Sequence, residues 1–335
     1  MTPPTRLNWK LPLLLYLATW LTTTFFRRIE YGNDTFYYFL LSLCLGVTVT
    51  ESAHEYWLEF SKHLWNAFQF SAALMLILTC HELGHYIQSW RYRLKCSLPF
   101  FLPMPFGPLG TLGAVIAMND EVPNKRALFD IGITGPLAGL IPTLIFLYYG
   151  IQWSYIGPRQ PGEIEFGEPL LFQWTVYWIY GQIPHDMMLH QHPIAMAAWA
   201  GLLLTTLNSM PFSQLDGGHV FYALLGRKSV PVVHCIFVAV LIAVVWYQLW
   251  HWSLMLFLIA MMGTTHPPTA DDSLPLTPFR YFLGWATLLF VLIGFTPTLL
   301  TLDEHTPLEK PILYCFGTES QECWSVSLAP AALPQ

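Results

Sequence analysis

The chain has few charged residues. Only 11% of its 335 residues are Asp, Glu, Lys or Arg, whereas 54% are hydrophobic. A soluble domain carries about 25% charged residues, so the composition excludes an ordinary soluble globular protein. There is no basic tract and the net charge is −6, which excludes nucleic acid as a plausible partner.

Cysteine is also scarce and scattered. None of the six cysteines forms a CxxC pair, which argues against a thiolate metal site. Cys80 directly precedes His81, but on a helix it points about 100° away from that histidine. Cys315 and Cys323 allow two interpretations, a disulfide or two free thiols on a flexible tail. No internal repeat or low-complexity block is present.

Long apolar runs are abundant instead. Runs of about 17 residues or more are sufficient to span or nearly span a bilayer. We predict an all-α polytopic membrane protein with about six to eight transmembrane helices. The first run lacks a convincing cleavage site and is interpreted as a retained span rather than a signal peptide. The candidate spans, of which the second and seventh are the weakest, are 11–26, 34–50, 65–88, 127–150, 193–212, 230–250, 252–265 and 278–300.

The placement of charge predicts an orientation. By the positive-inside rule, basic clusters that flank the spans mark the cytoplasmic side. The acidic residues of 51–59 and of the connection 151–192 then belong to the opposite side. The connection has about 40 residues and is rich in Trp, Tyr, Gly and Pro, which favours a structured cap at the membrane interface. The basic clusters are Arg91, Arg93, Lys95, Lys125, Arg126, Arg227 and Lys228.

The segment 97–118 cannot be a continuous helix, because four prolines fall within ten residues. It is nevertheless too apolar for an ordinary aqueous loop. Non-helical backbone at membrane depth is tolerated only where it is packed in protein or lines a cavity. We therefore expect a re-entrant strand or hairpin beside the active site, with an interfacial loop as the alternative.

A metal-binding pattern ends the third apolar run. His81 and His85 are four residues apart, so on a helix they share one face and can bind the same ion. Glu82 lies between them in sequence and can flank the metal without being a ligand. That is the position of a general base that takes a proton from an activated water.

Asp216 is the best candidate for a third protein ligand. An isolated carboxylate in an apolar stretch costs several kcal/mol or is protonated, and binding to a divalent cation removes that cost. Gly217 and Gly218 follow it directly. We expect these glycines to break the helix and to admit a close approach.

Together the two motifs resemble the site-2 protease family of intramembrane zinc metalloproteases, in the compact subgroup that lacks a PDZ domain. The motifs are His81–His85, of sequence HELGH, and Asn208–His219, of sequence NSMPFSQLDGGH. The resemblance covers roughly 60–270 and includes Gly135–Gly139 and His266–Thr269. It implies one zinc per chain, bound by the two histidines and by Asp216. It further implies that Glu82 activates water and that Asn208 contacts the substrate backbone or the oxyanion.

The resemblance implies a membrane-spanning protein substrate within a lipid bilayer. A bacterial inner membrane is the simplest location, with the active site nearer the cytoplasmic side. A catalytically silent metal-binding scaffold or chaperone is the main alternative, and a metal transporter is a third. The intact Glu82 argues against the scaffold, and the lack of a repeat argues against the transporter. We predict N-terminal membrane segments over 1–60, a metalloprotease core over 61–270, a transmembrane helix within 271–300 and a tail over 301–335.

Two further features carry alternatives. Gly135 and Gly139 form a small-xxx-small pattern that predicts a helix-packing face inside the core, with a homo-oligomer interface as the less favoured use. His219 is either a donor that supports the site or a capping residue. The histidines of the connection, His185, His190 and His192, are interpreted as solvated, with an accessory metal or pH-sensing site as the alternative.

Overall fold

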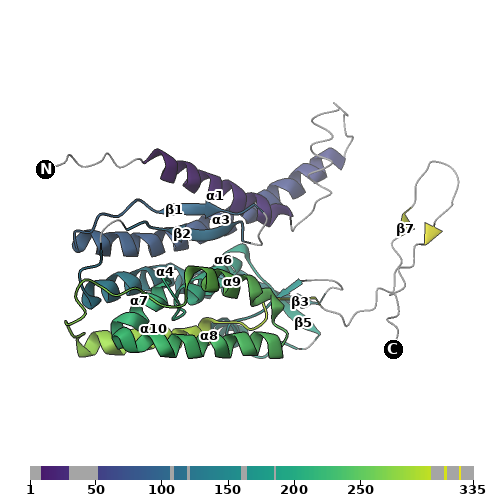
Figure 1. The fold of residues 1–335 in the computed structure, drawn as a ribbon. Coiled ribbons are helices and arrows are strands. Elements are labelled where there is room, and N and C mark those ends of the chain that lie inside the picture. The colour runs from purple at the N-terminus through teal and green to yellow at the C-terminus, as the bar shows by residue number, and fades with distance from the viewer. Residues whose placement is uncertain are drawn as a thin grey trace.

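The computed structural model describes residues 9–29, 52–105, 109–118, 121–159, 164–184, 186–302, 313–314 and 324–325. Helices dominate these residues, and the strands are short (Figure 1). The helices are α1 (Lys10–Ile29), α3 (Ser52–Arg91), α4 (Lys125–Trp153), α5 (Leu170–Tyr180), α6 (Pro193–Asn208), α7 (Asp216–Leu225), α8 (Ser229–Trp246), α9 (Ser253–Met262) and α10 (Pro278–Gly294). The strands are β1 (Phe100–Pro103), β2 (Thr111–Val115), β3 (Tyr155–Pro158), β4 (Ile164–Phe166), β5 (Met187–His190), β6 (Leu300–Leu302), β7 (Leu313–Tyr314) and β8 (Trp324–Ser325).

Three helical segments in the described part of the chain are long and apolar enough to cross a membrane. They are Ser61–Arg91, Lys125–Trp153 and Asp216–Trp246. Three shorter apolar helices, α6, α10 and the stretch Trp250–Met262, accompany them. This confirms the prediction of a mainly helical membrane protein, while the count of six to eight spans stays a prediction. The candidate span 34–50 and both Cys315 and Cys323 lie outside the described residues.

Helices α3, α4 and α6 pack against one another at the centre. Helix α6 is buried around most of its circumference, and its small side chains, among them Ala197, Ala200 and Gly201, let neighbouring helices approach closely. Helix α4 begins where the Asn124 side chain accepts a hydrogen bond from the Ala127 backbone N–H (3.0 Å). Pro136 and Pro142 lie inside α4, where each leaves one carbonyl four residues earlier without its usual N–H partner.

The proline-rich segment forms the predicted hairpin. Strands β1 and β2 pair antiparallel, with Phe100 opposite Val115 and Phe101 opposite Ala114. Helix α1 holds the hairpin from one side, since the Thr22 hydroxyl donates to the Gly110 carbonyl (2.7 Å) and Tyr16 meets Phe101 edge to face. Strand β2 contacts α3, the helix that carries His81 and His85.

The connection 151–192 is structured wherever it is described. Strands β3 and β5 pair antiparallel, α5 packs against α4, and the Trp199 indole donates to the Gly167 carbonyl (2.8 Å). The small sheets β3–β5, β4–β6 and β7–β8 were not predicted by an all-α fold. His192 caps α6, and His190 stacks on Tyr155. His185 lies outside the described residues, so the accessory site stays untested.

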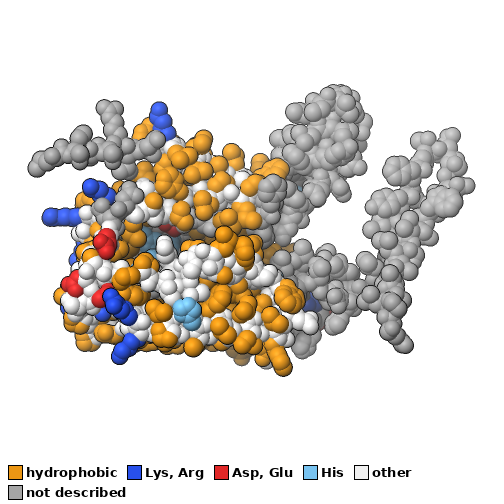
Figure 2. Space-filling view, in the orientation of Figure 1, with side chains coloured by type: hydrophobic (Ala, Val, Ile, Leu, Met, Phe, Trp, Pro, Cys, Tyr) orange, Lys and Arg blue, Asp and Glu red, His pale blue; other side chains and the backbone are white. Residues whose placement is uncertain are grey.

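The molecule has one end where charged side chains gather. In Figure 2 most of the visible face is apolar, and Lys, Arg, Asp and Glu cluster towards the left-hand end. The Lys125 ammonium lies beside Gly226, which directly precedes the basic pair Arg227 and Lys228. The Arg126 guanidinium donates to the Pro275 carbonyl (2.7 Å). The C-terminal end of α3 and the N-terminal ends of α4 and α10 meet here.

Candidate metal centre

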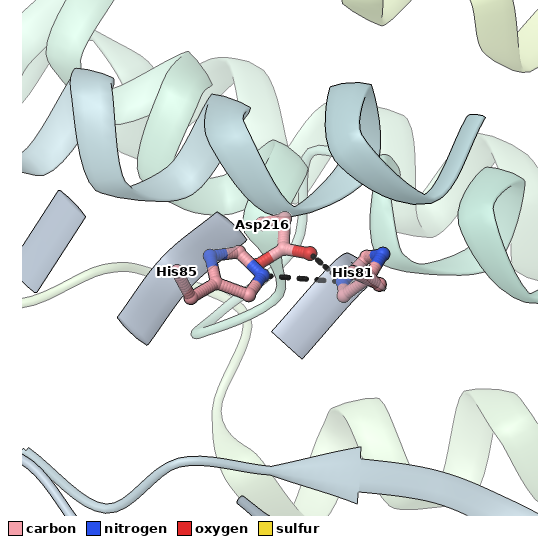
Figure 3. A group of neighbouring side chains, drawn as sticks. All are labelled: His81, His85 and Asp216. Carbon is pink, nitrogen blue, oxygen red and sulfur yellow. Dashed lines mark hydrogen bonds and ion pairs between the residues drawn. The ribbon is translucent and has the colours of Figure 1, made fainter. Parts of the chain in front are cut away.

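His81, His85 and Asp216 converge on one point, although Asp216 is 135 residues from His81 in the chain (Figure 3). The Nε2 atoms of His81 and His85 are 3.1 Å apart. Asp216 places Oδ2 3.1 Å from His81 Nε2 and Oδ1 3.2 Å from His85 Nε2. Within the described residues, this is the one group of three such side chains close enough to share a metal ion.

These distances fit a tetrahedral metal site. Ligand atoms about 2.0 to 2.1 Å from a zinc ion are about 3.3 Å apart in a tetrahedron. The polarity of the three atoms also fits. His85 Nδ1 lies 2.8 Å from the Ile131 carbonyl oxygen, which can only accept a hydrogen bond. A neutral His85 therefore carries its proton on Nδ1, and its Nε2 lone pair faces the Asp216 carboxylate. Because Nε2 and the carboxylate oxygen are then both acceptors, their short distance requires a cation between them.

Glycines of α4 make room for the two imidazoles. A Cβ on Gly135 would overlap the His85 ring at Nε2, and a Cβ on Gly139 would lie 3.0 Å from the His81 Cβ. On the opposite helix, a Cβ on Gly84 would collide with the Thr134 carbonyl. The predicted small-residue pattern is thus a packing face between α3 and α4, and the histidines fill the space that it leaves.

A tight turn over 209–215 delivers Asp216 to the site. Helix α6 ends at Asn208, and Asp216 is the first residue of α7, where an acidic side chain is favoured by the helix dipole. Side chains at Gly217 and Gly218 would collide with the carbonyls of Ser209 and Ser213. The expected close approach is confirmed, but the expected helix break is wrong, because both glycines lie in the first turn of α7.

Glu82 and Asn208 are placed around this centre. Glu82 is 4% exposed and interacts electrostatically with His81, His85 and Asp216. Asn208 is partly buried at the end of α6, directly before the Ser209 carbonyl that packs against Gly217. The structure thus brings all five predicted residues to one region of the molecule.

His219 lies on α7, three residues after Asp216, and contacts the segment that contains His266. His219 is partly buried, and its Nδ1 atom is buried without a hydrogen-bond partner. The His219 Cβ would lie 2.8 Å from a Cβ on Gly132. The His266 ring meets it edge to face at 4.8 Å, and Tyr222 donates to Asp272 (2.6 Å) farther along the same segment. The motif His266–Thr269 therefore packs on α7, close to the site.

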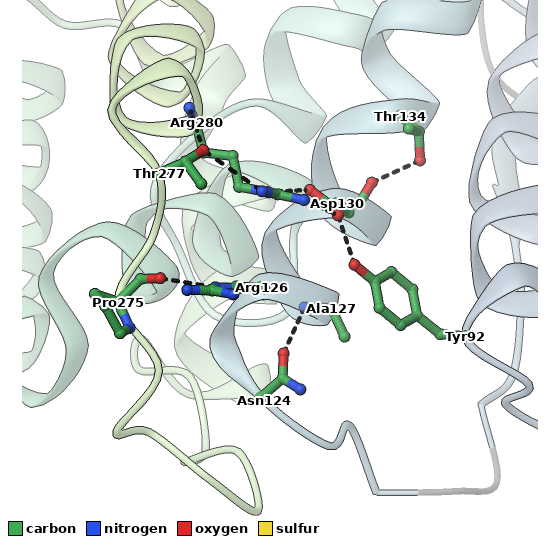
Figure 4. A network of polar contacts seen from close by, with 9 residues as sticks. All are labelled: Tyr92, Asn124, Arg126, Ala127, Asp130, Thr134, Pro275, Thr277 and Arg280. Carbon is green, nitrogen blue, oxygen red and sulfur yellow. Dashed lines mark hydrogen bonds and ion pairs between the residues drawn. The ribbon is translucent and has the colours of Figure 1, made fainter.

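The sequence did not predict a polar cluster around Asp130 of α4. Asp130 receives two hydrogen bonds from Arg280 of α10, each 2.7 Å long, and one from Tyr92 at the end of α3, 2.6 Å long (Figure 4). The signal in the sequence was a lone aspartate five residues into an apolar span. The Ile131 carbonyl that orients His85 had no sequence signal, because every residue carries one.

Comparison with known proteins supports the same region. The profile of peptidase family M50 matches residues 69–247, more than half of the chain. "Probable zinc metalloprotease EGY1, chloroplastic" of Oryza sativa subsp. japonica is 29% identical over 165 residues, which are 47% of this chain and 28% of the relative. "Probable zinc metalloprotease EGY2, chloroplastic" of Arabidopsis thaliana is 30% identical over 158 residues, which are 46% of this chain and 28% of the relative.

The chain thus matches only about 28% of the length of these curated relatives. The matched profile region nevertheless includes both motifs, with His81, Glu82 and His85 in the first and Asp216 in the second. The described part of the chain also has three helices long and apolar enough to cross a membrane. The chain is therefore an integral membrane protein that belongs to peptidase family M50.

Proposed function

We propose that the protein is an intramembrane zinc endopeptidase, with one zinc ion held by His81, His85 and Asp216. The observation that carries the proposal is the convergence of two imidazole nitrogens and a carboxylate within 3.2 Å of one another, on two spans that are long enough to cross a bilayer. The names of the relatives, which call them probable zinc metalloproteases, support the choice of zinc.

The chemistry is divided among the residues of the site. When bound, zinc supplies a Lewis acid that polarises the scissile carbonyl and activates water. Glu82 accepts the proton of the attacking water and returns it to the leaving amine. Asn208 donates a hydrogen bond to the oxygen of the scissile carbonyl, as a preorganised dipole does in a site shielded from bulk water. The burial of Glu82 next to the three ligands supports its role as the base.

The substrate class that we propose is a membrane-spanning protein segment. A helical segment hides its carbonyls in its own hydrogen bonds and must unwind before attack. The hairpin β1–β2 offers an extended edge on which an unwound peptide could pair as an added strand. Support comes from the contact of β2 with α3 and from the exposure of Leu112 and Val115 on β2, 61% and 51%.

Metal analysis of the detergent-purified protein tests the proposed ligands without knowledge of the substrate. We expect about one zinc per chain in the wild type and in Glu82→Gln, and a loss of zinc in Asp216→Ala. Asp186→Ala is the matched control, because Asp186 is an exposed acid. A folded wild type without zinc, or Asp216→Ala with full zinc, would refute the site and favour the scaffold alternative.

Hydrolysis is tested with a labelled single-span peptide reconstituted with the protein in lipid vesicles. Cleavage by the wild type, and loss of cleavage in a zinc-loaded Glu82→Gln variant, would establish the role of Glu82 as base. Val115→Pro should abolish cleavage while zinc binding persists, because proline removes a strand hydrogen-bond donor. Unchanged cleavage in folded Val115→Pro would rule out strand addition.

We propose that the basic end of the molecule faces the cytoplasm, on the positive-inside argument. The bacterial inner membrane, the homo-oligomer and the domain boundaries at 60, 270 and 300 stay predictions. Labelling of single cysteines introduced at Lys95 and at Trp153 tests the orientation, with the native cysteines replaced. Modification of the Lys95 position from outside intact cells would contradict it.

A further inference from the structure

The Asp130 cluster joins three helices at the charged end of the molecule. Its members are Asp130 on α4, Arg280 on α10 and Tyr92 at the end of α3. The Arg280 guanidinium donates to both carboxylate oxygens of Asp130, from Nε and from Nη2, and the Tyr92 hydroxyl donates to Oδ2 (Figure 4). Such a bidentate ion pair fixes the direction of the two side chains as well as their distance. The carboxylate is mostly buried, with 15% of its side chain exposed.

The cluster lies next to the atom that orients a proposed metal ligand. Asp130 is followed by Ile131, whose carbonyl lies 2.8 Å from His85 Nδ1. Tyr92 directly follows α3, and its backbone N–H still donates to the Gln88 carbonyl (3.1 Å). It is seven residues, or about two turns, after His85 and therefore continues the face that carries His85. Helix α3 therefore holds α4 at two successive residues, through the side chain of Asp130 and through the main chain of Ile131.

Rotation or sliding of α4 would break both contacts together. The helix is open to such movement because Pro136 removes one main-chain hydrogen bond just beyond this turn. Thr134 bonds back to the carbonyls of Asp130 (2.8 Å) and Ile131 (3.2 Å), so the two residues move as one unit. Arg280 ties this unit to α10, which packs on α4 and α7.

We propose that Asp130 is a positioning residue, which acts with Arg280 and Tyr92 to hold the Ile131 carbonyl where it orients the His85 imidazole towards the metal. The inference rests on the proposed function only in that His85 binds a metal. Asp130 touches neither the metal nor the substrate. It acts through the main chain of α4.

The test measures metal binding, without a substrate. The full chain in detergent is titrated with Zn²⁺ against a chelator, and with Co²⁺, whose visible absorption reports the ligand geometry. Loss of a partner that orients a metal ligand typically weakens metal affinity roughly 10- to 100-fold. Because Asp130 acts through one intermediate group, we expect Asp130→Asn to raise the dissociation constant by roughly tenfold and to alter the Co²⁺ spectrum.

Arg126→Gln is the matched control. Arg126 lies one turn earlier on α4, and its guanidinium donates to the Pro275 carbonyl just before α10 (2.7 Å). Its loss weakens the same helix contact but leaves Asp130 and Ile131 in place. We expect a dissociation constant and Co²⁺ spectrum like those of the wild type. If Arg126→Gln matched Asp130→Asn in both measurements, general loosening of the helices would be the cause and the inference would be wrong.

Tyr92→Phe keeps the test decisive if Asp130→Asn does not fold. It leaves the ion pair with Arg280 intact and removes only the contact with α3. We expect a dissociation constant a few-fold higher than that of the wild type. An unchanged constant in Tyr92→Phe, or in folded Asp130→Asn, would overturn the inference. A wild type that binds no metal would instead refute the proposed function.

Discussion

The two spans that pack around the histidines differ sharply from the span that begins at Asp216. In the most hydrophobic stretches of Ser61–Arg91 and Lys125–Trp153, 56% and 44% of the residues are buried inside the protein. In the corresponding stretch of Asp216–Trp246 the share is 17%, even though this span is the most hydrophobic of the three. Helix α8, which makes up most of it, exposes Val238, Leu241, Ile242 and Val245.

The difference separates two uses of apolar sequence. Lipid accepts any large apolar side chain, so α8 needs hydrophobicity and little else. Helices α3 and α4 must hold His81, His85 and Asp130 inside the membrane, which requires small residues at the contact and a partner for each polar group. The two spans that pack around the histidines are therefore less hydrophobic than the span that begins at Asp216.

The largest effect is expected from one added methyl group at the α3–α4 contact. In an open helix position Gly→Ala is stabilising by about 1 kcal/mol. At Gly135 the new Cβ would overlap the His85 ring, so we expect Gly135→Ala to lose the metal site. Gly139→Ala, where the new Cβ meets the His81 Cβ at 3.0 Å, should be milder. The zinc content of each purified variant gives the measurement.

Ile145→Ala provides the control within α4, since this side chain is 49% exposed. It should keep the zinc content of the wild type. Zinc content in Gly135→Ala equal to that of the control would mean that the histidines have more room than the structure gives them.

Two phenylalanines, one buried and one exposed, are expected to contribute differently to stability. Phe129 of α4 is 1% exposed and Phe257 of α9 is 59% exposed. Phe129→Ala should cost roughly 3 to 5 kcal/mol, because it removes a packed ring and leaves a cavity. Phe257→Ala should cost less than about 1 kcal/mol, because most of the ring is exposed and its removal leaves no cavity inside the protein. Thermal unfolding in detergent, measured on both variants side by side, should rank them in this order, and equal losses would contradict it.

The smallest expected effect concerns the pH dependence of the contact between Tyr92 and α4. Burial, together with the hydrogen bond to Asp130, raises the pKa of Tyr92 to about 12. The neutral hydroxyl is thus favoured in the folded state. Its contribution to stability is fully present below pH 10, the ordinary pKa, and is lost as the pH rises towards 12.

Melting temperatures of the wild type and of Tyr92→Phe, compared across this range, provide the measurement. The difference between them should be constant below pH 10 and should shrink above it. A difference that stays the same up to pH 12 would show that folding does not raise the pKa of Tyr92. Titration of other groups affects both proteins alike and cancels in the difference.

Much of the architecture follows from local sequence rules. The apolar runs predicted the helices that contain His81, Gly135 and Phe257, because hydrophobic length is read directly from composition. The prolines of 97–118 predicted the hairpin, since they exclude a helix. The boundary at Asp216 was harder. Gly217 and Gly218 were expected to break a helix. Instead they lie in the first turn of α7, where only a residue without a side chain leaves space for the carbonyls of Ser209 and Ser213.

The sequence by itself determined the ligand types, their helical spacing at His81 and His85, and the membrane environment that makes a buried Asp216 costly without a cation. It could not determine which face of α4 receives the imidazoles or that Arg280 pairs with Asp130. Those contacts join residues 46 to 150 positions apart. Only the tertiary structure decided them, because helix packing brings together backbone carbonyls and side chains whose distance along the chain carries no local signal.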